Sequence, residues 1–571
     1  MFKPKIKTCQ NCNSKFTIEP EDFEFYKKVG VPTPTFCPEC RMRRRFMFRN
    51  ERNLSKRKDD LTGKEIFSMF SQESPIKVYE RKIWWSDEWD PMEYGQKYDF
   101  NKPFFEQIKE LSRKVPWPSR VLDDPIINSD YCANGNSLKN CYLAFSTGWS
   151  EDCAYIIMAS YAKDCYDNSY IAKCELCYDN FQIAGCYKTF FSSNCADCQE
   201  VYFSKDLVNC QNCFGCTNLR HKKYHIFNKQ YTKEEYFKKL KEFNIFDYNG
   251  LIKQKEDYNE ICKKAIHKFA QIIKSVNSIG DNLKNVKNCK NAFDVKKAED
   301  CKFVNWGGDV CKDSYDSGPG FGAVAELLYE SIDTGVEAAK SFFTWVSFSN
   351  YDVQYSINCH SSSNLFACVG LRHKQYCILN KQYTKKEYEE LVPQIKKHMN
   401  DMPYTDKKGR VYKYGEFFPP ELSPFGYNET IANEYFPLTK EEAIEQGYNW
   451  YDKPKNEYKP TIKASNLPDN IKDVDDSILK EVIECDSNNC AGSNVFRIIP
   501  QELKFYKKMN LPLPHLCPDC RHRERIKQRN PLKLWKRQCM NKGCNNTFQT
   551  TYSPDRKEII YCEGCYNKEV S

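Results

Sequence analysis

Twelve of the 31 cysteines fall into three sets of four with the spacing of tetrahedral zinc sites. In each set two closely spaced pairs are separated by a longer segment, and the sets are Cys9, Cys12, Cys37 and Cys40; Cys485, Cys490, Cys517 and Cys520; and Cys539, Cys544, Cys562 and Cys565. Four thiolates complete the coordination of Zn²⁺ and leave no open position for a substrate. The sequence therefore predicts three zinc ions with a structural role and no catalytic metal.

The first two sets lie in two copies of one module at opposite ends of the chain. The N-terminal copy reads FTIEPEDFEFYKKVGVPTPTF before CPEC-RMRRR, and the C-terminal copy reads FRIIPQELKFYKKMNLPLPHL before CPDC-RHRER. This pattern resembles a small zinc-ribbon, treble-clef-like domain of bacteria, over residues 7–50 and 483–530. The layout of the whole chain resembles large cysteine-rich zinc-binding proteins of candidate-phylum bacteria. The resemblance implies zinc binding and a treble-clef-like fold, but no particular activity.

The N-terminal copy has no counterpart of the third cysteine set. The aligned positions are occupied by Asp59, Lys64, Trp85 and Glu88. We expect Trp84, Trp85 and Trp89 to form an apolar core there, because buried aromatic area can replace the folding energy of a metal site.

An arginine-rich segment without helix breakers follows each CPxC pair, which predicts a helix. Residues 41–58 carry nine Lys or Arg against one acid, and residues 521–537 carry eight against one, although the whole chain has a net charge of only +9. Such helices could bind phosphates and stack on bases. The candidate nucleic-acid-binding residues are Arg41, Arg43, Arg44, Arg45, Arg49, Arg521, Arg523 and Arg525. Alternatively, these arginines only offset the negative charge of a zinc–tetrathiolate centre.

The middle of the chain is repetitive. Five cysteines recur every 21 residues between short β-type runs, and they are Cys132, Cys153, Cys174, Cys195 and Cys216. Residues 213–240 match residues 365–392, and both copies end in a capping box. These repeats predict two tandem parallel β-solenoids with helical caps, rungs near 21 residues and cysteines stacked about 4.8 Å apart. Since Leu365 stands where Cys213 does, we interpret the mid-chain cysteines as buried packing residues and not as ligands.

The predicted fold class is multidomain and mainly β, with the two solenoids flanked by small treble-clef or zinc-ribbon modules. The expected segments are an N-terminal module (1–60), a Trp-rich degenerate half-module and helix (61–127), the first solenoid with its cap helix (128–248), a helix with the second solenoid and cap helix (249–398), a Pro/Tyr-rich linker (399–480), the second module (481–530) and a further zinc site (531–571).

No apolar run of membrane-spanning length and no signal-peptide pattern is present, so we expect a cytoplasmic protein without membrane contact. A cysteine-dense extracellular repeat protein is the alternative. No Walker, Rossmann, GxSxG or HExxH motif occurs, so we expect no enzyme. The favoured function is zinc-dependent binding of RNA or the ribosome. The alternative is a protein-binding scaffold along the solenoid surface.

Two further patterns are candidates for polar sites. Arg220-His221-Lys222 and Arg372-His373-Lys374 recur at corresponding solenoid ends. The acids of GGDVCKDSYD, which are Asp309, Asp313 and Asp316, would suit a polysaccharide-acting solenoid enzyme if they clustered in one groove. That enzyme is the remote alternative.

Overall fold

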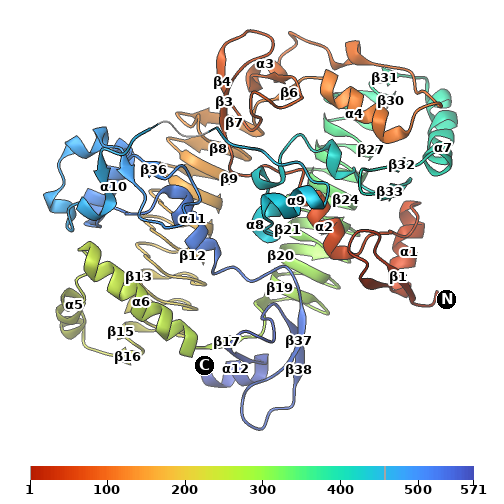
Figure 1. The fold of residues 1–571 in the computed structure, drawn as a ribbon. Coiled ribbons are helices and arrows are strands. Elements are labelled where there is room, and N and C mark those ends of the chain that lie inside the picture. Colours follow the sequence, from red (N-terminus) through yellow and green to blue (C-terminus); the bar gives the residue numbers. More distant parts are fainter. Residues whose placement is uncertain (1, 455–457, 571) are drawn as a thin grey trace.

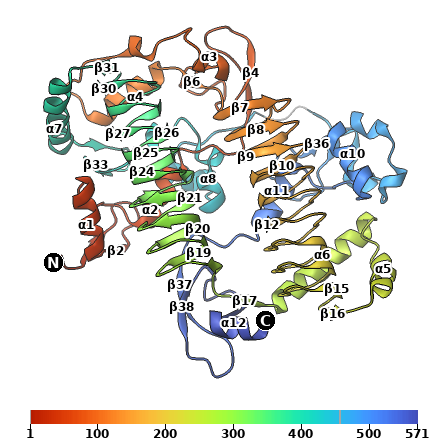
Figure 2. The ribbon, with the colours of Figure 1, turned by 180° about the vertical axis from the view of Figure 1, so that it is seen from behind.

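Two stacks of parallel β-strands lie side by side in the computed structural model, which describes residues 2–454 and 458–570 (Figure 1). The predicted class, a multidomain and mainly β chain with parallel sheets, is confirmed, and 12 α-helices lie within the described residues. Figures 1 and 2 show that the two stacks run in opposite directions, so each begins beside the end of the other.

The first stack consists of β7 (Leu122–Ile127), β8 (Gly135–Lys139), β9 (Tyr142–Glu151), β10 (Ala154–Ser160), β11 (Ser169–Ala172), β12 (Phe181–Ala184), β13 (Gln199–Tyr202), β14 (Gln211–Phe214), β15 (Lys223–Ile226) and the returning β16 (Lys229–Gln230). The second consists of β18 (Ile272–Ile273), β19 (Ile279–Lys284), β20 (Lys290–Glu299), β21 (Asn305–Lys312), β22 (Tyr315–Ser317), β23 (Phe321–Gly322), β24 (Ala325–Gly335), β25 (Ala338–Phe342), β26 (Trp345–Phe348), β27 (Tyr351–Gln354), β28 (Ile357–His360), β29 (Ser363–Phe366), β30 (Gln375–Ile378) and the returning β31 (Lys381–Gln382).

The repeating coil of the first stack has 12 residues, so the predicted period of 21 is wrong. Parallel pairs join Glu151 to Lys163 and Ala154 to Tyr166, and the same offset of 12 recurs on two further sides of the coil, three residues apart each time. A step of 21 residues equals one coil plus three of its four sides. The five cysteines of the 21-residue series therefore occupy successive sides of the core and do not stack on one another.

Every third residue of the first stack points into a narrow core, which explains the cysteines. Cys165 Sγ donates to the carbonyls of Lys163 (3.3 Å) and Cys174 (3.5 Å). Ser204 Oγ makes the corresponding bond to the carbonyl two residues earlier. A small side chain that can satisfy a nearby carbonyl fits such a position, so cysteine and serine both serve there.

The residue before each inward position adopts a left-handed conformation. Asn140 (φ 52), Asp152 (φ 55) and Asp164 (φ 49) are examples along one corner of the coil. Asn and Asp tolerate this conformation better than other non-glycine residues. Their frequency in the sequence is therefore a consequence of the tight four-sided coil.

Helices begin and end the stacks. α4 (Phe104–Lys114) and α6 (Tyr248–Lys264) precede them, and α5 (Lys233–Glu242) and α7 (Lys385–Asp401) follow them. The predicted capping boxes of α5 and α7 are present. The helix expected over residues 258–276 ends earlier, because residues 266–268 form β17 (Ile266–Lys268) and the first coil of the second stack begins there.

The remaining elements belong to the terminal modules and the linker. The N-terminal module holds β1 (Lys5–Thr8), β2 (Lys15–Ile18), α1 (Pro20–Val29) and α2 (Pro38–Phe46), followed by β3 (Ser55–Lys58), β4 (Glu65–Ser68), β5 (Val78–Tyr79), α3 (Arg81–Trp85) and β6 (Trp117–Pro118). The linker holds β32 (Tyr404–Thr405), β33 (Val411–Tyr412), α8 (Ile431–Tyr435), α9 (Lys440–Glu445) and β34 (Ile462–Lys463). The C-terminal part holds β35 (Ile483–Glu484), β36 (Val495–Phe496), α10 (Pro500–Met509), α11 (Pro518–Ile526), β37 (Trp535–Gln538), β38 (Thr547–Thr550), β39 (Ile559–Tyr561) and α12 (Glu563–Val570).

Replacing Cys174 by Val should leave the zinc content unchanged and cost less than about 1.5 kcal/mol, because Val201 already occupies an inward position of the same core. Replacing the zinc-set residue Cys517 by Val should instead remove one metal ion per chain. Elemental analysis and urea denaturation of both variants check this. Loss of zinc from the Cys174 variant would mean that the stack cysteines bind metal after all.

Candidate metal centres and module–stack interfaces

The three predicted cysteine sets each converge on one point. Within each set the Sγ atoms all lie within 4.8 Å of one another. The Sγ–Sγ separations include 3.7 Å for Cys12–Cys37 and 3.5 Å for Cys490–Cys517. A tetrahedron with Zn–S bonds of about 2.3 Å has edges of about 3.8 Å. Each group could therefore hold one metal ion, matching the three ions predicted, and four sulfur donors at this separation suit zinc.

Backbone N–H groups point at several of the sulfurs. Cys517 N–H donates to Cys485 Sγ, and Cys562 N–H donates to Cys539 Sγ, each at 3.2 Å. Such bonds favour the thiolate that a metal needs. Burial opposes ionisation of Cys562, but hydrogen bonds from the backbone of Cys565 and from Asn546 lower the pKa of its thiol to about 6.

A carboxylate replaces the third metal site in the N-terminal copy. Asp59 accepts hydrogen bonds from the N–H groups of Leu61 (2.9 Å) and Thr62 (2.6 Å), and also from the N–H of Glu80. The bond from Glu80 corresponds to the one that Cys562 donates to Cys539. Glu80, and not Trp85 as the sequence alignment suggested, thus takes the place of Cys562.

The tryptophans beside this carboxylate only partly form the expected apolar core. Trp84 is fully buried, and its Nε1 donates to the Pro116 carbonyl at 2.9 Å. Trp85 is 42% exposed. The buried ring and the Asp59 hydrogen bonds together therefore replace the metal.

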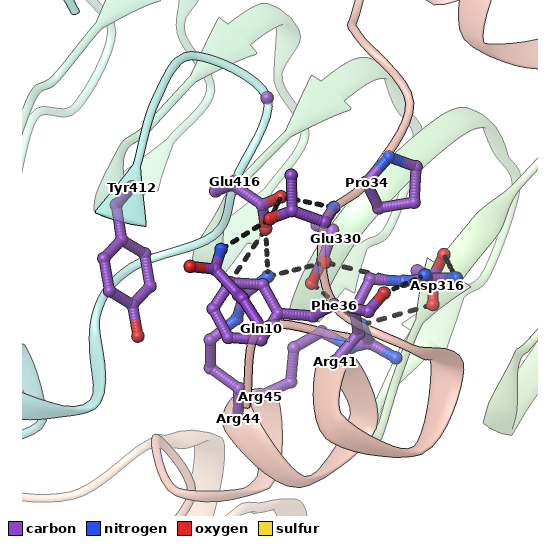
Figure 3. Close-up of polar contacts among 12 residues, drawn as sticks. Gln10, Pro34, Phe36, Arg41, Arg44, Arg45, Asp316, Glu330, Tyr412 and Glu416 are labelled. Carbon is purple, nitrogen blue, oxygen red and sulfur yellow. Dashed lines mark hydrogen bonds and ion pairs between the residues drawn. The ribbon is translucent and has the colours of Figure 1, made fainter. Parts of the chain in front are cut away.

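The arginines of α2 are buried against the second stack. Arg41 Nη2 lies 2.8 Å from Asp316 Oδ2, and Arg45 Nη1 lies 2.8 Å from Glu330 Oε2. All four side chains are 1% exposed or less. Burial raises the pKa of Asp316, whereas Arg41 and Arg45 oppose that shift. Figure 3 shows these guanidinium groups reaching from α2 toward the two carboxylates.

Two further arginines extend the contact. Arg44 Nη2 lies 2.9 Å from Glu330 Oε1 and 3.1 Å from Glu416 Oε2 of the linker. Arg49 contacts Asp333 on the second stack and donates to Ser146 Oγ on the first stack at 2.5 Å. The N-terminal module is therefore tied to both stacks and to the linker by buried polar contacts.

The C-terminal module makes the same kind of contact with the first stack. Arg521 Nη1 lies 2.5 Å from Asp167 Oδ2 and 3.1 Å from Glu502 Oε1. Arg525 Nη1 lies 2.8 Å from Asp167 Oδ1. Burial raises the pKa of Glu502, against the lowering by Arg521. The docking is reciprocal, since the N-terminal module binds the second stack and the C-terminal module binds the first.

Aromatic stacking repeats at both interfaces. Phe25 of α1 stacks on Tyr315 with ring centroids 3.9 Å apart, and Phe505 of α10 stacks on Tyr166 at 4.2 Å. Phe25 and Phe505 are equivalent positions of the two modules, 480 residues apart. Each module–stack interface thus combines a stacked Phe and buried arginines of the module with a Tyr-acid pair of the stack.

The segments that follow each module reach the other stack. β5 pairs in parallel with β6, which leads into the first stack, and β39 pairs in parallel with β17, which leads into the second. Each terminal region therefore contacts both stacks. The two terminal regions join the stacks at opposite ends, as Figure 1 shows.

None of the eight arginines predicted to bind nucleic acid presents a free guanidinium group. Six of them are buried side chains, namely Arg41, Arg44, Arg45, Arg49, Arg521 and Arg525. Arg43 lies over the Phe436 ring at 4.8 Å. Arg523 donates to the Asn489 carbonyl at 2.5 Å and lies 3.9 Å from Cys520 Sγ. Only Arg523 also fits the alternative of offsetting zinc–thiolate charge, because the buried six face carboxylates and Arg43 faces a ring.

The sequence reasoning missed the acidic partners. A Tyr followed by an acid occurs on adjacent coils of both stacks, as Tyr166-Asp167, Tyr178-Asp179, Tyr315-Asp316 and Tyr329-Glu330. This recurrence was a usable signal. Its meaning depends on the modules that contact it, which lie far away in the sequence.

The other candidate residues have structural partners. Arg220 pairs with Asp206 at 2.9 Å, and Arg372 lies 5.4 Å from the Trp84 ring. The three acids that would suit a polysaccharide-acting enzyme have separate cationic partners. These are Lys297 for Asp309, Lys28 for Asp313, and Arg41 with Arg45 for Asp316. They do not form a carboxylate pair in one groove.

No protein-family model matches this chain, and no curated protein matches it. Within the part of the chain that the structure describes, no helix is both long and apolar enough to cross a bilayer. The modules' relation to treble-clef domains therefore rests on their motif alone.

Replacing Glu330 by Ala should destabilise the protein by about 3–5 kcal/mol, because it leaves Arg44 and Arg45 buried with fewer negative partners. Glu326→Ala is the matched control, since that side chain is exposed on the same strand. Urea denaturation of both variants measures the difference. Equal stability would show that the buried pairs contribute little.

Chelation should release the third metal ion first. Cys544 and Cys565 are half-buried, whereas only Cys490 of the second set and only Cys12 of the first lack full burial. A colorimetric zinc assay should show one fast and two slow phases. Cys565→Ser should abolish the fast phase alone, and loss of a slow phase instead would contradict this order.

Proposed function

We propose that this chain is a non-enzymatic zinc-binding scaffold, in which two antiparallel β-solenoids are held together by zinc-stabilised modules. The observation that carries this is the reciprocal docking of each module on the distant stack through buried arginine–carboxylate pairs. Four-sulfur sites with no open position support a structural role for the metal. The classification of the stacks as solenoids is supported by their parallel 12-residue register.

A protein partner is favoured for the groove between the two modules. This groove has a volume of about 1150 Å³, and its lining includes Trp450, Arg523 and the ion pair of Arg52 with Asp519. Aromatic residues and charges of both signs are typical of protein-binding surfaces. A polyanion would be repelled by the acids that line it.

RNA or ribosome binding through the arginine helices is the second candidate, and it would require α2 or α11 to leave its stack. The buried ion pairs oppose such a movement, because each separated charge would have to be solvated or left unpaired. We also propose a cytoplasmic location. All 31 cysteines are free thiols, which suits a reducing compartment.

The scaffold proposal predicts that the molecule stays together when its chain is cut. A protease site inserted beside exposed Asn244, between the stacks, would give two fragments that each carry one module and one stack. They should co-elute in size-exclusion chromatography while zinc is bound. Chelation should separate them, because metal loss unfolds the modules that dock across the cut.

Glu330→Ala in the cut protein should make separation easier, and Glu326→Ala should not. Fragments that separate with zinc still bound would contradict the proposal. So would fragments that remain together after complete metal loss.

A further inference from the structure

The end of the first stack carries a cluster of exposed lysines without acidic partners. We call it the lysine cap. It consists of the β15–β16 hairpin and α5, and its exposed lysines are Lys222, Lys223, Lys229, Lys233, Lys238 and Lys241. None of these six forms an ion pair with any residue that the structure describes. Figure 1 places the cap at an outer corner of the molecule, away from both modules.

Acids do little to balance this charge. Residues 221–241 contain seven lysines and two glutamates. Glu235 already serves the α5 capping box, where Thr232 N–H donates to its carboxylate at 2.9 Å. The cap therefore presents a net positive surface at neutral pH.

Aromatic rings lie among these lysines. Phe227 is 47% exposed and Phe237 is 39% exposed. Lys229 and Lys239 lie over the ring of Tyr231, at 5.6 Å and 5.5 Å. Exposed rings interleaved with cations are the features that bind unpaired bases and the phosphates between them.

The second stack shows that its fold does not need this surface. At equivalent positions 152 residues later, Lys223 becomes Gln375 and Phe237 becomes Glu389. Residues 373–393 contain four lysines and three glutamates. The local structure is nevertheless shared, because Asn228 and Asn380 make the same hydrogen bond to the preceding coil, at 2.9 Å and 2.8 Å.

The equivalent of Phe227 is also covered in the second stack. Leu379 is 0% exposed, and its carbonyl accepts a hydrogen bond from Gln96 N–H at 3.0 Å. Thus the same element is basic, aromatic and open at one stack, and nearly neutral and covered at the other.

Protection of a sheet edge does not account for the lysines. Charged residues commonly guard exposed edge strands. Here β16 already pairs with β15, and α5 packs against β15. The terminal strand is thus covered without help from the lysine side chains.

We propose that the lysine cap is a binding surface for single-stranded nucleic acid, with phosphates on its lysines and bases on Phe227 and Phe237. Rings can stack on bases only where those bases are unpaired, so a single strand is favoured over a duplex. This inference goes beyond the scaffold function and does not depend on the zinc modules. It also moves the polyanion-binding surface from the buried arginines to an exposed site.

Fluorescence anisotropy with labelled single-stranded RNA and DNA of mixed sequence, about 12 nucleotides long to span one such site, tests the proposal on the full-length zinc-loaded protein. The cap variant combines Lys222→Glu, Lys223→Glu, Lys238→Glu and Lys241→Glu. It should weaken binding at least about ten-fold, and reduce the slope of log affinity against log salt by about three, since each phosphate contact contributes about 0.7. The RNA and DNA arms establish which strand is preferred.

The control variant reverses four lysines of the second cap, namely Lys374, Lys381, Lys385 and Lys386, and so makes the same change in net charge. It should bind within about two-fold of wild type, because distant charges are screened. Phe237→Ala should weaken single-strand binding about five-fold or more and leave duplex binding unchanged. Zinc content and thermal unfolding verify that every variant is folded.

Equal loss of affinity in both lysine variants would overturn the proposal in favour of a general effect of net charge. Wild-type affinity in the cap variant, or no salt-dependent binding by wild type, would overturn it as well. Failure here leaves the fragment co-elution result unaffected, so the two proposals can be judged separately.

Discussion

Buried ion pairs between module arginines and stack carboxylates make the parts of this protein depend on one another. Arg45 and Glu330 are both 0% exposed, so each lies where an unpaired charge would be strongly unfavourable. Separation of a module from its stack would leave charges on both sides in need of solvation. The zinc sites anchor the helices that carry these arginines, and metal binding is thereby coupled to assembly of the whole chain.

The reciprocal docking gives the chain an internal symmetry that its residue order conceals. The N-terminal module precedes its neighbouring stack, whereas the C-terminal module follows its own, so the two halves are related by duplication with a different order of parts. Each module nevertheless packs on the other half's stack through equivalent residues, as Phe25 on Tyr315 and Phe505 on Tyr166 show. Contacts between such distant segments slow folding but leave neither half independent.

The 12-residue coil explains two compositional features at once. Its core accepts only small inward side chains, and the thiols there donate to nearby backbone carbonyls. Its corners need left-handed residues, which explains the many Asn and Asp residues between strands. The same geometry frees the outward positions for other uses. They carry the acids that hold the modules and, at one end, the lysine cap.

The sequence alone determined the features that depend on local spacing. The three cysteine sets, the capping boxes and the parallel, repetitive middle were all predictable, because ligand spacing and local hydrogen bonds involve few residues. The coil length was misread, since every third residue points inward and cysteines on different sides can share a false 21-residue period. Only the tertiary structure decided the role of the arginines. Arg41 and Asp316 lie 275 positions apart, and no local pattern reveals that a basic helix will be covered by a distant acidic strand.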